Sequence, residues 1–166
     1  MVKLEPLTRA AFADFGDVID CDGVTPKLIN QGFAKRYNNL SPTTDLGGLP
    51  ADGLNVNISI FVAQPRPMPI EIKLMERHPL ATQAFYPTQN QEWLVVVAGD
   101  PQREESYRGF RATGRQGVTY GKNIWHHPLL VLQPDSYFVI VDRRGPEANL
   151  EEVELKESLF VGLGLF

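Results

Sequence analysis

Apolar and polar residues alternate along much of the middle of the chain. In "NVNISIFVA", residues 55–63, Val or Ile occupies every second position, and this period of two predicts a strand with one apolar and one mixed face. After the Pro-rich turn "QPRPMP", the segment "IEIKLMERHP" at 70–79 alternates in the same way. It predicts a second strand, half buried, in which Ile70, Ile72 and Leu74 face inward.

Short apolar runs separated by Pro, Gly, Asn and Asp predict the remaining strands. These runs are residues 83–86, 93–99, 117–120, 125–132 and 137–142, with one or two more in 151–155 and 159–166 and a short one around 33–40. Helical spacing is limited to the segment between Thr8, a favourable N-cap, and Gly16, and to Arg103–Ala112. The predicted fold class is mainly β, an antiparallel barrel or sandwich with a few short helices.

Two of the predicted strands are apolar on both faces, namely "WLVVVA" at 93–98 and "WHHPLLVL" at 125–132. A barrel wall with one face in water does not require this pattern, so we expect the outer face to be covered by a helix or by another subunit. The resulting hypothesis is a homodimer with an apolar, self-complementary interface.

Composition and charge narrow the function classes. The chain has the length of one domain, residues 1–166, and no repeat suggests a second. The formal net charge is -4 and the basic residues are scattered, which argues against nucleic acid as a partner. Glu5 and Pro6 stand where a secretory apolar segment would lie, and no run approaches the roughly 20 apolar residues that span a bilayer. We expect a cytoplasmic protein without membrane contact, in which the single cysteine, Cys21, is incidental.

The end of the 70–79 strand carries the best candidates for chemistry. If the alternation continues, Glu76 and His78 face inward together with Leu74. A buried carboxylate is unfavourable unless it is paired or bound to a cation, so this pair calls for a partner such as a divalent metal. Gln83 lies past a turn, where the next strand can bring its amide oxygen back to the same point. The plainer alternative is a buried ion pair that closes the strand.

The other two histidines, His126 and His127, are adjacent in the sequence. Adjacent residues in a strand point to opposite faces, so at most one of them can join Glu76 and His78. Histidine is a common metal ligand and titrates near neutral pH, which makes these positions functional candidates by type. The alternative is that the two histidines, next to Pro128, form a turn or a dimer contact.

Six blocks are spread over most of the chain: "LEPLTRAAFADFGDVI", "INQG.A.R", "ISIF.AQPR", "ERHP...QAF", "LVVVA" and "WHHPLL". Together they resemble the ureidoglycolate lyase family, which older usage calls ureidoglycolate hydrolase. The resemblance implies a cupin-like β-barrel of the jelly-roll type (a double-stranded β-helix) and a dimer. It also implies cleavage of (S)-ureidoglycolate to glyoxylate and urea in allantoin breakdown, a part of purine catabolism.

The resemblance further implies a metal site. Many metal-binding cupins share a motif of His, any residue, His, four residues and Glu, with a last His on a later strand. That spacing falls on Glu76, His78 and Gln83, with His126 as the later histidine, so Glu replaces the first His and Gln replaces the Glu. The family's association with nickel implies a divalent metal on these four side chains, without an organic cofactor. Asn123 departs from the pattern, because these lyases usually have Gly there.

By the same resemblance, Glu76, His78 and His126 are the candidate catalytic residues. The candidate substrate-binding residues are Asn30, Gln31, Arg36 and Gln83. A guanidinium suits the substrate carboxylate because it donates paired hydrogen bonds; Arg66 and Tyr120 are lesser candidates. Two other functions stay open at this point: another metal-dependent cupin enzyme acting on a small hydroxy acid or sugar derivative, and a non-catalytic barrel that binds a small carboxylate.

Overall fold

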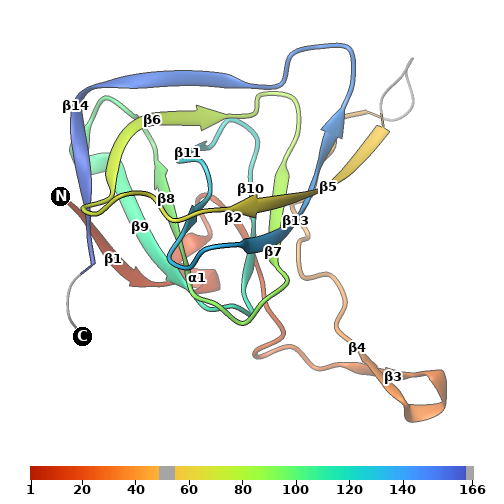
Figure 1. The fold of residues 1–166 in the computed structure, drawn as a ribbon. Coiled ribbons are helices and arrows are strands. Elements are labelled where there is room, and N and C mark those ends of the chain that lie inside the picture. Colours follow the sequence, from red (N-terminus) through yellow and green to blue (C-terminus); the bar gives the residue numbers. More distant parts are fainter. Residues whose placement is uncertain (49–54, 164–166) are drawn as a thin grey trace.

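The computed structural model describes residues 1–48 and 55–163, and its secondary structure is almost entirely strand (Figure 1). The strands are β1 (Val2–Pro6), β2 (Gly16–Ile19), β3 (Lys27–Ile29), β4 (Ala34–Arg36), β5 (Asn55–Ala63), β6 (Glu71–Arg77), β7 (Gln83–Pro87), β8 (Trp93–Ala98), β9 (Tyr107–Ala112), β10 (Gly117–Tyr120), β11 (Trp125–His126), β12 (Leu130–Val131), β13 (Ser136–Arg144) and β14 (Glu151–Gly162). The helical elements are α1 (Arg9–Phe12) and two single turns, η1 (Asn30–Gly32) and η2 (Glu104–Ser106). None of the helices in the described residues is long and apolar enough to span a membrane.

The strands form two large sheets and one small hairpin. Seven strands pair in the order β11-β6-β14-β1-β9-β8-β12, and because β11 also pairs with β8, six of them close into a barrel. Five strands pair in the order β2-β10-β7-β13-β5, and β3 pairs with β4. The predicted fold class, a mainly β, cupin-like antiparallel barrel with a few short helices, is confirmed, although β1 pairs in parallel with both β14 and β9.

The two segments with helical spacing have different outcomes. The first is helical, as predicted: the Thr8 hydroxyl accepts a hydrogen bond from the amide of Ala11 at 3.1 Å and starts α1. The second prediction is wrong, because after the single turn η2 the rest of 103–112 forms β9. This strand lies between β1 and β8 in the barrel, and Phe110 and Ala112 point into the core. Pairing on both sides therefore overrides the local spacing.

Strand β8 separates two cores, and its side chains alternate between them. Trp93, Val95 and Val97 belong to the first core, between the barrel and the five-stranded sheet. Leu94, Val96 and Ala98 face the second core, which the barrel strands enclose. Both apolar faces of 93–98 are thus covered by the chain itself. They give no ground for a second subunit, contrary to the reasoning from the sequence.

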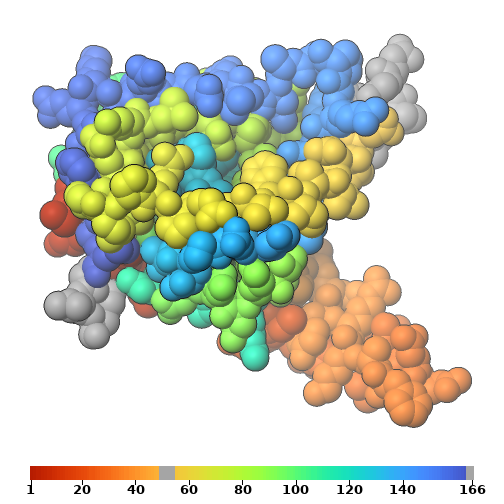
Figure 2. Space-filling view, viewed as in Figure 1, coloured from red at the N-terminus to blue at the C-terminus, as the bar shows by residue number. Residues whose placement is uncertain are grey.

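An exposed apolar face does occur, on β5. This strand lies at the edge of the five-stranded sheet, next to β13, and runs across the face of the molecule seen in Figure 2. Its Val and Ile side chains, predicted as the apolar face, point outward, and Ile58 is 69% exposed. The opposite face, which includes Asn57 and Ser59, is half buried. The predicted strand is therefore present, but a single chain leaves its apolar face uncovered.

The hairpin of β3 and β4 projects from the body of the molecule (Figures 1 and 2). It carries the exposed side chains of Leu28 and Phe33, the latter 91% exposed. At the other end of the chain, the two segments predicted as strands at 151–155 and 159–166 belong to one strand, β14, which ends at Gly162. Residues 164–166 of the second prediction lie outside the described residues.

Candidate metal centre

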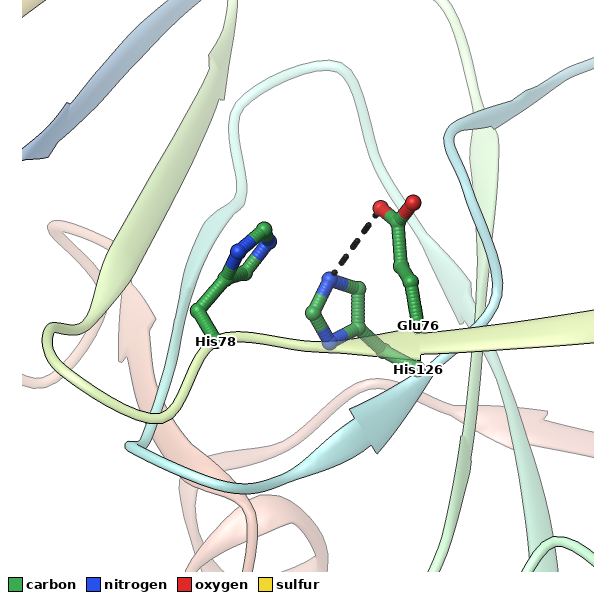
Figure 3. Close-up of side chains that lie close together, drawn as sticks. All are labelled: Glu76, His78 and His126. Carbon is green, nitrogen blue, oxygen red and sulfur yellow. Dashed lines mark ion pairs between the residues drawn. The ribbon is translucent and has the colours of Figure 1, made fainter. Parts of the chain in front are cut away.

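Three ionisable side chains meet where β6 ends. In the antiparallel pairing of β11 with β6, His126 lies directly opposite Glu76, and His78 follows in the turn after β6. One candidate ligand atom from each of these residues lies within 4.8 Å of the other two. Figure 3 shows the three side chains pointing into one shared space, Glu76 and His126 from paired strands and His78 from the turn. The sequence prediction that these three positions converge is thus supported by their geometry.

The reason for the convergence differs from the one predicted. Ile70, Ile72 and Met75 all pack in the second core, and the three-residue step from Ile72 to Met75 breaks the alternation. The partner strand β14 shifts its register in this region, between Glu154 and Leu159. The prediction that Ile70 and Ile72 share a face with Glu76 is therefore wrong. Glu76 follows Met75 and points away from the second core, toward the space beside the first.

Backbone carbonyls orient both imidazole rings. The Nδ1 atom of His78 is 2.6 Å from the carbonyl oxygen of Asn149, and Nδ1 of His126 is 2.9 Å from that of Ile124. Because a carbonyl oxygen only accepts, each Nδ1 carries a proton, and in the neutral form of each ring Nε2 presents a lone pair. Both Nε2 atoms are shielded from solvent and have no hydrogen-bond partner among the described residues. Such lone pairs are available to a cation.

Within the cluster, Nε2 of His126 lies 3.4 Å from Oε1 of Glu76. A lone pair facing a carboxylate oxygen is repulsive unless a proton or a metal ion supplies positive charge between them. Burial raises the pKa of Glu76, but the contact with His126 and the electrostatic effect of the neighbouring imidazoles outweigh burial, and the pKa lies below its ordinary value. Glu76 is therefore a carboxylate at neutral pH.

Gln83 is the fourth candidate ligand and is 7% exposed. It lies on β7, directly opposite Tyr120 of β10, whose ring stacks on His126 with centroids 4.0 Å apart and planes 7° from parallel. Side chains opposite each other in a sheet share one face, so Gln83 faces the same region. Its Nε2 donates to Asp142 at 3.1 Å, while its Oε1 is shielded and without a partner among the described residues.

Of the two adjacent histidines, one belongs to the cluster and the other does not. His126 joins the cluster, whereas the amide of His127 donates to the carbonyl of Val96 and its Nδ1 contacts the carbonyl of Pro128. Burial, partly offset by that contact, lowers the pKa of His127 to about 4, and Arg66 contributes in the same direction. His127 is thus a neutral, buried residue outside the cluster.

The donor set fits a divalent metal ion. Two imidazole nitrogens and one carboxylate converge, and the amide of Gln83 faces the same region. The two nitrogens and the amide oxygen are buried atoms without a hydrogen-bond partner among the described residues. A buried polar atom without a partner costs about 1–3 kcal/mol, so three such atoms beside a carboxylate fit a site that holds a cation. A mixed nitrogen and oxygen set suits Ni²⁺, Zn²⁺, Fe²⁺ and Mn²⁺.

The other predicted binding residues lie elsewhere. Asn30 and Gln31 form the tip of the projecting hairpin, with positive φ angles of 51° and 58°, and Arg36 is on β4. All three are exposed, and the structure does not bring them to the cluster within one chain. Arg66 lines a pocket beside His127.

The cluster is supported by several residues whose role could not be predicted from the sequence. Asn149 holds His78 through its backbone and caps the amide of Leu80 with its side chain. Asp142 holds Gln83. At Asn123, where Gly was the family expectation, φ is 61°, a value that Asn tolerates, and its amide donates to the carbonyl of His78 at 3.0 Å. That departure is therefore compatible with the site.

Fold and cluster together define a cupin-like barrel protein with a candidate metal centre at one side of its core. A family model described as ureidoglycolate lyase matches residues 1–162. The chain belongs to the ureidoglycolate lyase family.

Curated relatives agree with this assignment. Ureidoglycolate lyase 1 of Rhizobium meliloti (strain 1021) is 46% identical over 97% of this chain and 93% of its own length. The ureidoglycolate lyase of Azotobacter vinelandii is 44% identical over 92% of this chain and 90% of its own. That of Brucella abortus is 49% identical over 91% of this chain and 88% of its own. Among solved structures, Bacillus subtilis oxalate decarboxylase, studied for its Mn(II) centres, has a TM-score of 0.37 and 12% identity over 65% of this chain and 29% of that one.

Proposed function

We propose that the protein is a metal-dependent ureidoglycolate lyase whose divalent ion is held by Glu76, His78, Gln83 and His126. Family membership supports the activity. The observation that supports the metal is the group of unpartnered, buried donor atoms beside the Glu76 carboxylate. Nickel is the proposed metal and (S)-ureidoglycolate the proposed substrate. The proposed compartment is the cytoplasm.

The substrate carries a hydroxyl, a carboxylate and a ureido nitrogen on one carbon. In the elimination, the hydroxyl loses its proton and its electrons form the carbonyl of glyoxylate. The bond from carbon to nitrogen breaks, and the nitrogen takes the electron pair and one proton to leave as urea. The site must therefore accept a proton at the hydroxyl and supply one at the nitrogen.

The roles we assign follow from the charge of each group. Glu76 is ionised, so the carboxylate oxygen that does not hold the ion accepts the hydroxyl proton and then returns it to the leaving nitrogen. His78 and His126 are fixed through Nδ1 and keep their Nε2 lone pairs directed at the shared space. When bound, the divalent ion supplies positive charge that lowers the hydroxyl pKa and orients the substrate.

The substrate carboxylate also calls for a cation, and Arg36 remains our proposal. In one chain its hairpin projects away from the cluster. We therefore propose a homodimer in which the partner's Arg36, with the partner's Asn30 and the partner's Gln31, approaches the substrate. The uncovered apolar face of β5 supports such a dimer, because an exposed edge strand of this kind is a surface for association.

The direct test is release of urea and glyoxylate from ureidoglycolate by the purified protein, with Ni²⁺, Mn²⁺ or Zn²⁺ supplied. Release well above the spontaneous rate is expected. His78→Ala should remove most of the activity while the far-UV circular dichroism stays unchanged. Absence of release with all three metals would refute the proposed activity, and normal turnover by His78→Ala would remove that residue from the site.

A further inference from the structure

We propose that Asp142 is a positioning residue of the metal centre. It holds the Gln83 side chain so that the carbonyl oxygen of the amide, and not its NH₂ group, faces the cluster. The inference rests on the proposed metal-dependent function and assigns a role to a strand, β13, that contributes none of the four ligands.

The contacts form a short relay across three neighbouring strands. Asp142 on β13 lies directly opposite Asn57 on β5 and next to the residues of β7. One oxygen, Oδ1, accepts from Nδ2 of Asn57 at 2.8 Å, and the other, Oδ2, accepts from Nε2 of Gln83 at 3.1 Å. Asn57 and Asp142 are half buried and Gln83 is buried, so these bonds are partly protected from competition with water.

The chemistry of the carboxylate fixes the orientation of the amide. The two ends of a Gln side chain have almost the same shape, but one donates and the other accepts. A carboxylate only accepts, so Gln83 must turn Nε2 toward Asp142 and Oε1 the other way. The reversed orientation would place two oxygens against each other and leave the NH₂ group of Gln83 toward the cluster. Asn57 occupies the second oxygen of Asp142 and so holds the carboxylate itself in place.

The consequence concerns the ligand atom. Oε1 of Gln83 is shielded from solvent and has no partner among the described residues. It lies on the wall where Tyr120 stacks on His126. An amide oxygen in that place binds a divalent ion, whereas an NH₂ group would repel it. Residues that orient a ligand in this way typically contribute about 10–100-fold to metal affinity.

A double-mutant cycle on Asp142 and Gln83 tests the inference by calorimetric titration with Ni²⁺. In Asp142→Asn the one remaining side-chain oxygen still accepts the shorter hydrogen bond, from Asn57, and the new NH₂ group points at Gln83. The amide of Gln83 then rotates so that its oxygen accepts from this NH₂ group and its own NH₂ group faces the cluster. Affinity for Ni²⁺ is expected to fall about 10–100-fold. In Gln83→Glu two carboxylates face each other, and adding Asp142→Asn removes that repulsion and supplies a donor. The same Asp142→Asn change should therefore raise the affinity at least 10-fold in the Gln83→Glu background.

This reversal of sign separates positioning from a structural role. If Asp142 only stabilised the fold, Asp142→Asn would lower the affinity, or leave it unchanged, in both backgrounds, and either result would overturn the inference. The chain offers a matched control in Asp135, which accepts from Nε2 of Gln64 at 2.7 Å in an exposed pair of the same chemistry. Asp135→Asn should leave Ni²⁺ affinity unchanged.

The outcome is distinguishable from that of the proposed function. Wild-type protein that binds Ni²⁺ and releases no urea would refute the lyase activity but leave the cycle fully measurable. Wild-type protein that binds Ni²⁺, with no change of sign in the cycle, would overturn the role of Asp142 and leave the activity in place. Wild-type protein that binds none of Ni²⁺, Mn²⁺ and Zn²⁺ would overturn both the metal centre and the inference.

Discussion

The stack of Tyr120 on His126 predicts how strongly one aromatic residue stabilises both the core and the site. Tyr120 is 3% exposed, and besides His126 it packs against Phe85, with centroids 5.6 Å apart, and Phe12, at 6.2 Å. An aromatic pair contributes about 0.5–1.5 kcal/mol beyond the burial of its surface. Three pairs together contribute roughly 1.5–4.5 kcal/mol on that scale. Tyr120→Leu should therefore lower the free energy of unfolding by roughly 2–4 kcal/mol.

Tyr120→Phe is the matched control, because it keeps all three ring contacts and removes only the hydroxyl. Its expected loss is under about 1 kcal/mol. The assay is urea denaturation followed by far-UV circular dichroism, without added metal and at one fixed protein concentration. Equal losses in the two variants would refute the reasoning, since the hydroxyl and not the stack would then matter. Tyr120→Leu should also weaken Ni²⁺ binding more than Tyr120→Phe, because only the former frees the ring of His126.

Three further outcomes follow from single positions. Gly16→Ala should lower the free energy of unfolding by roughly 3–5 kcal/mol, since φ is 146° and a Cβ would lie 1.8 Å from the Thr119 carbonyl oxygen; a denaturation midpoint close to that of the wild type would contradict this. Ile58→Lys should convert the proposed dimer to monomer in sedimentation at micromolar concentration, and a persisting dimer would exclude β5 as the interface. Asn123→Gly should leave Ni²⁺ affinity and stability within measurement error, whereas Asn123→Val should lose about 1–2 kcal/mol at this positive φ; equal stability of the two would show that the turn is not constrained.

The strands were largely predictable because a period of two is a local signal. Alternation over 55–63 gave β5, and the short apolar runs gave β7, β8, β10 and β13 close to their observed bounds. Whether the apolar face of a strand is buried or exposed was less predictable, because burial depends on which other elements pack against that face. The same apolar pattern is solvent-exposed on β5 and divided between two cores on β8. The helix predicted at 103–112 was wrong for a related reason: pairing with β1 and β8 makes residues 107–112 a strand, and β1 is distant in sequence.

The ligands of the candidate centre were predictable by type and the residues that orient them were not. Glu76, His78 and His126 stand out in a chain with three histidines, and the converging geometry agrees with their selection. Nothing in the sequence near Asp142 or Asn149 links either residue to the cluster, because each is joined to it by one contact across the fold. Spacing along one strand is a weak guide when the strand contains an irregularity, as β6 does.

That irregularity explains why the centre lies where it does. With strict alternation, a strand that sends Ile72 into the enclosed second core would send Glu76 there too, among aliphatic side chains with no charge to offset a carboxylate. The three-residue step to Met75 keeps the apolar side chains in that core and turns Glu76 to the other face. There it meets His126 across the strand pair, while the turn at Asn123 holds the carbonyl of His78. The same break in alternation that made the predicted orientation of Glu76 wrong therefore lets β6 contribute apolar side chains to the second core and Glu76 to the candidate metal centre.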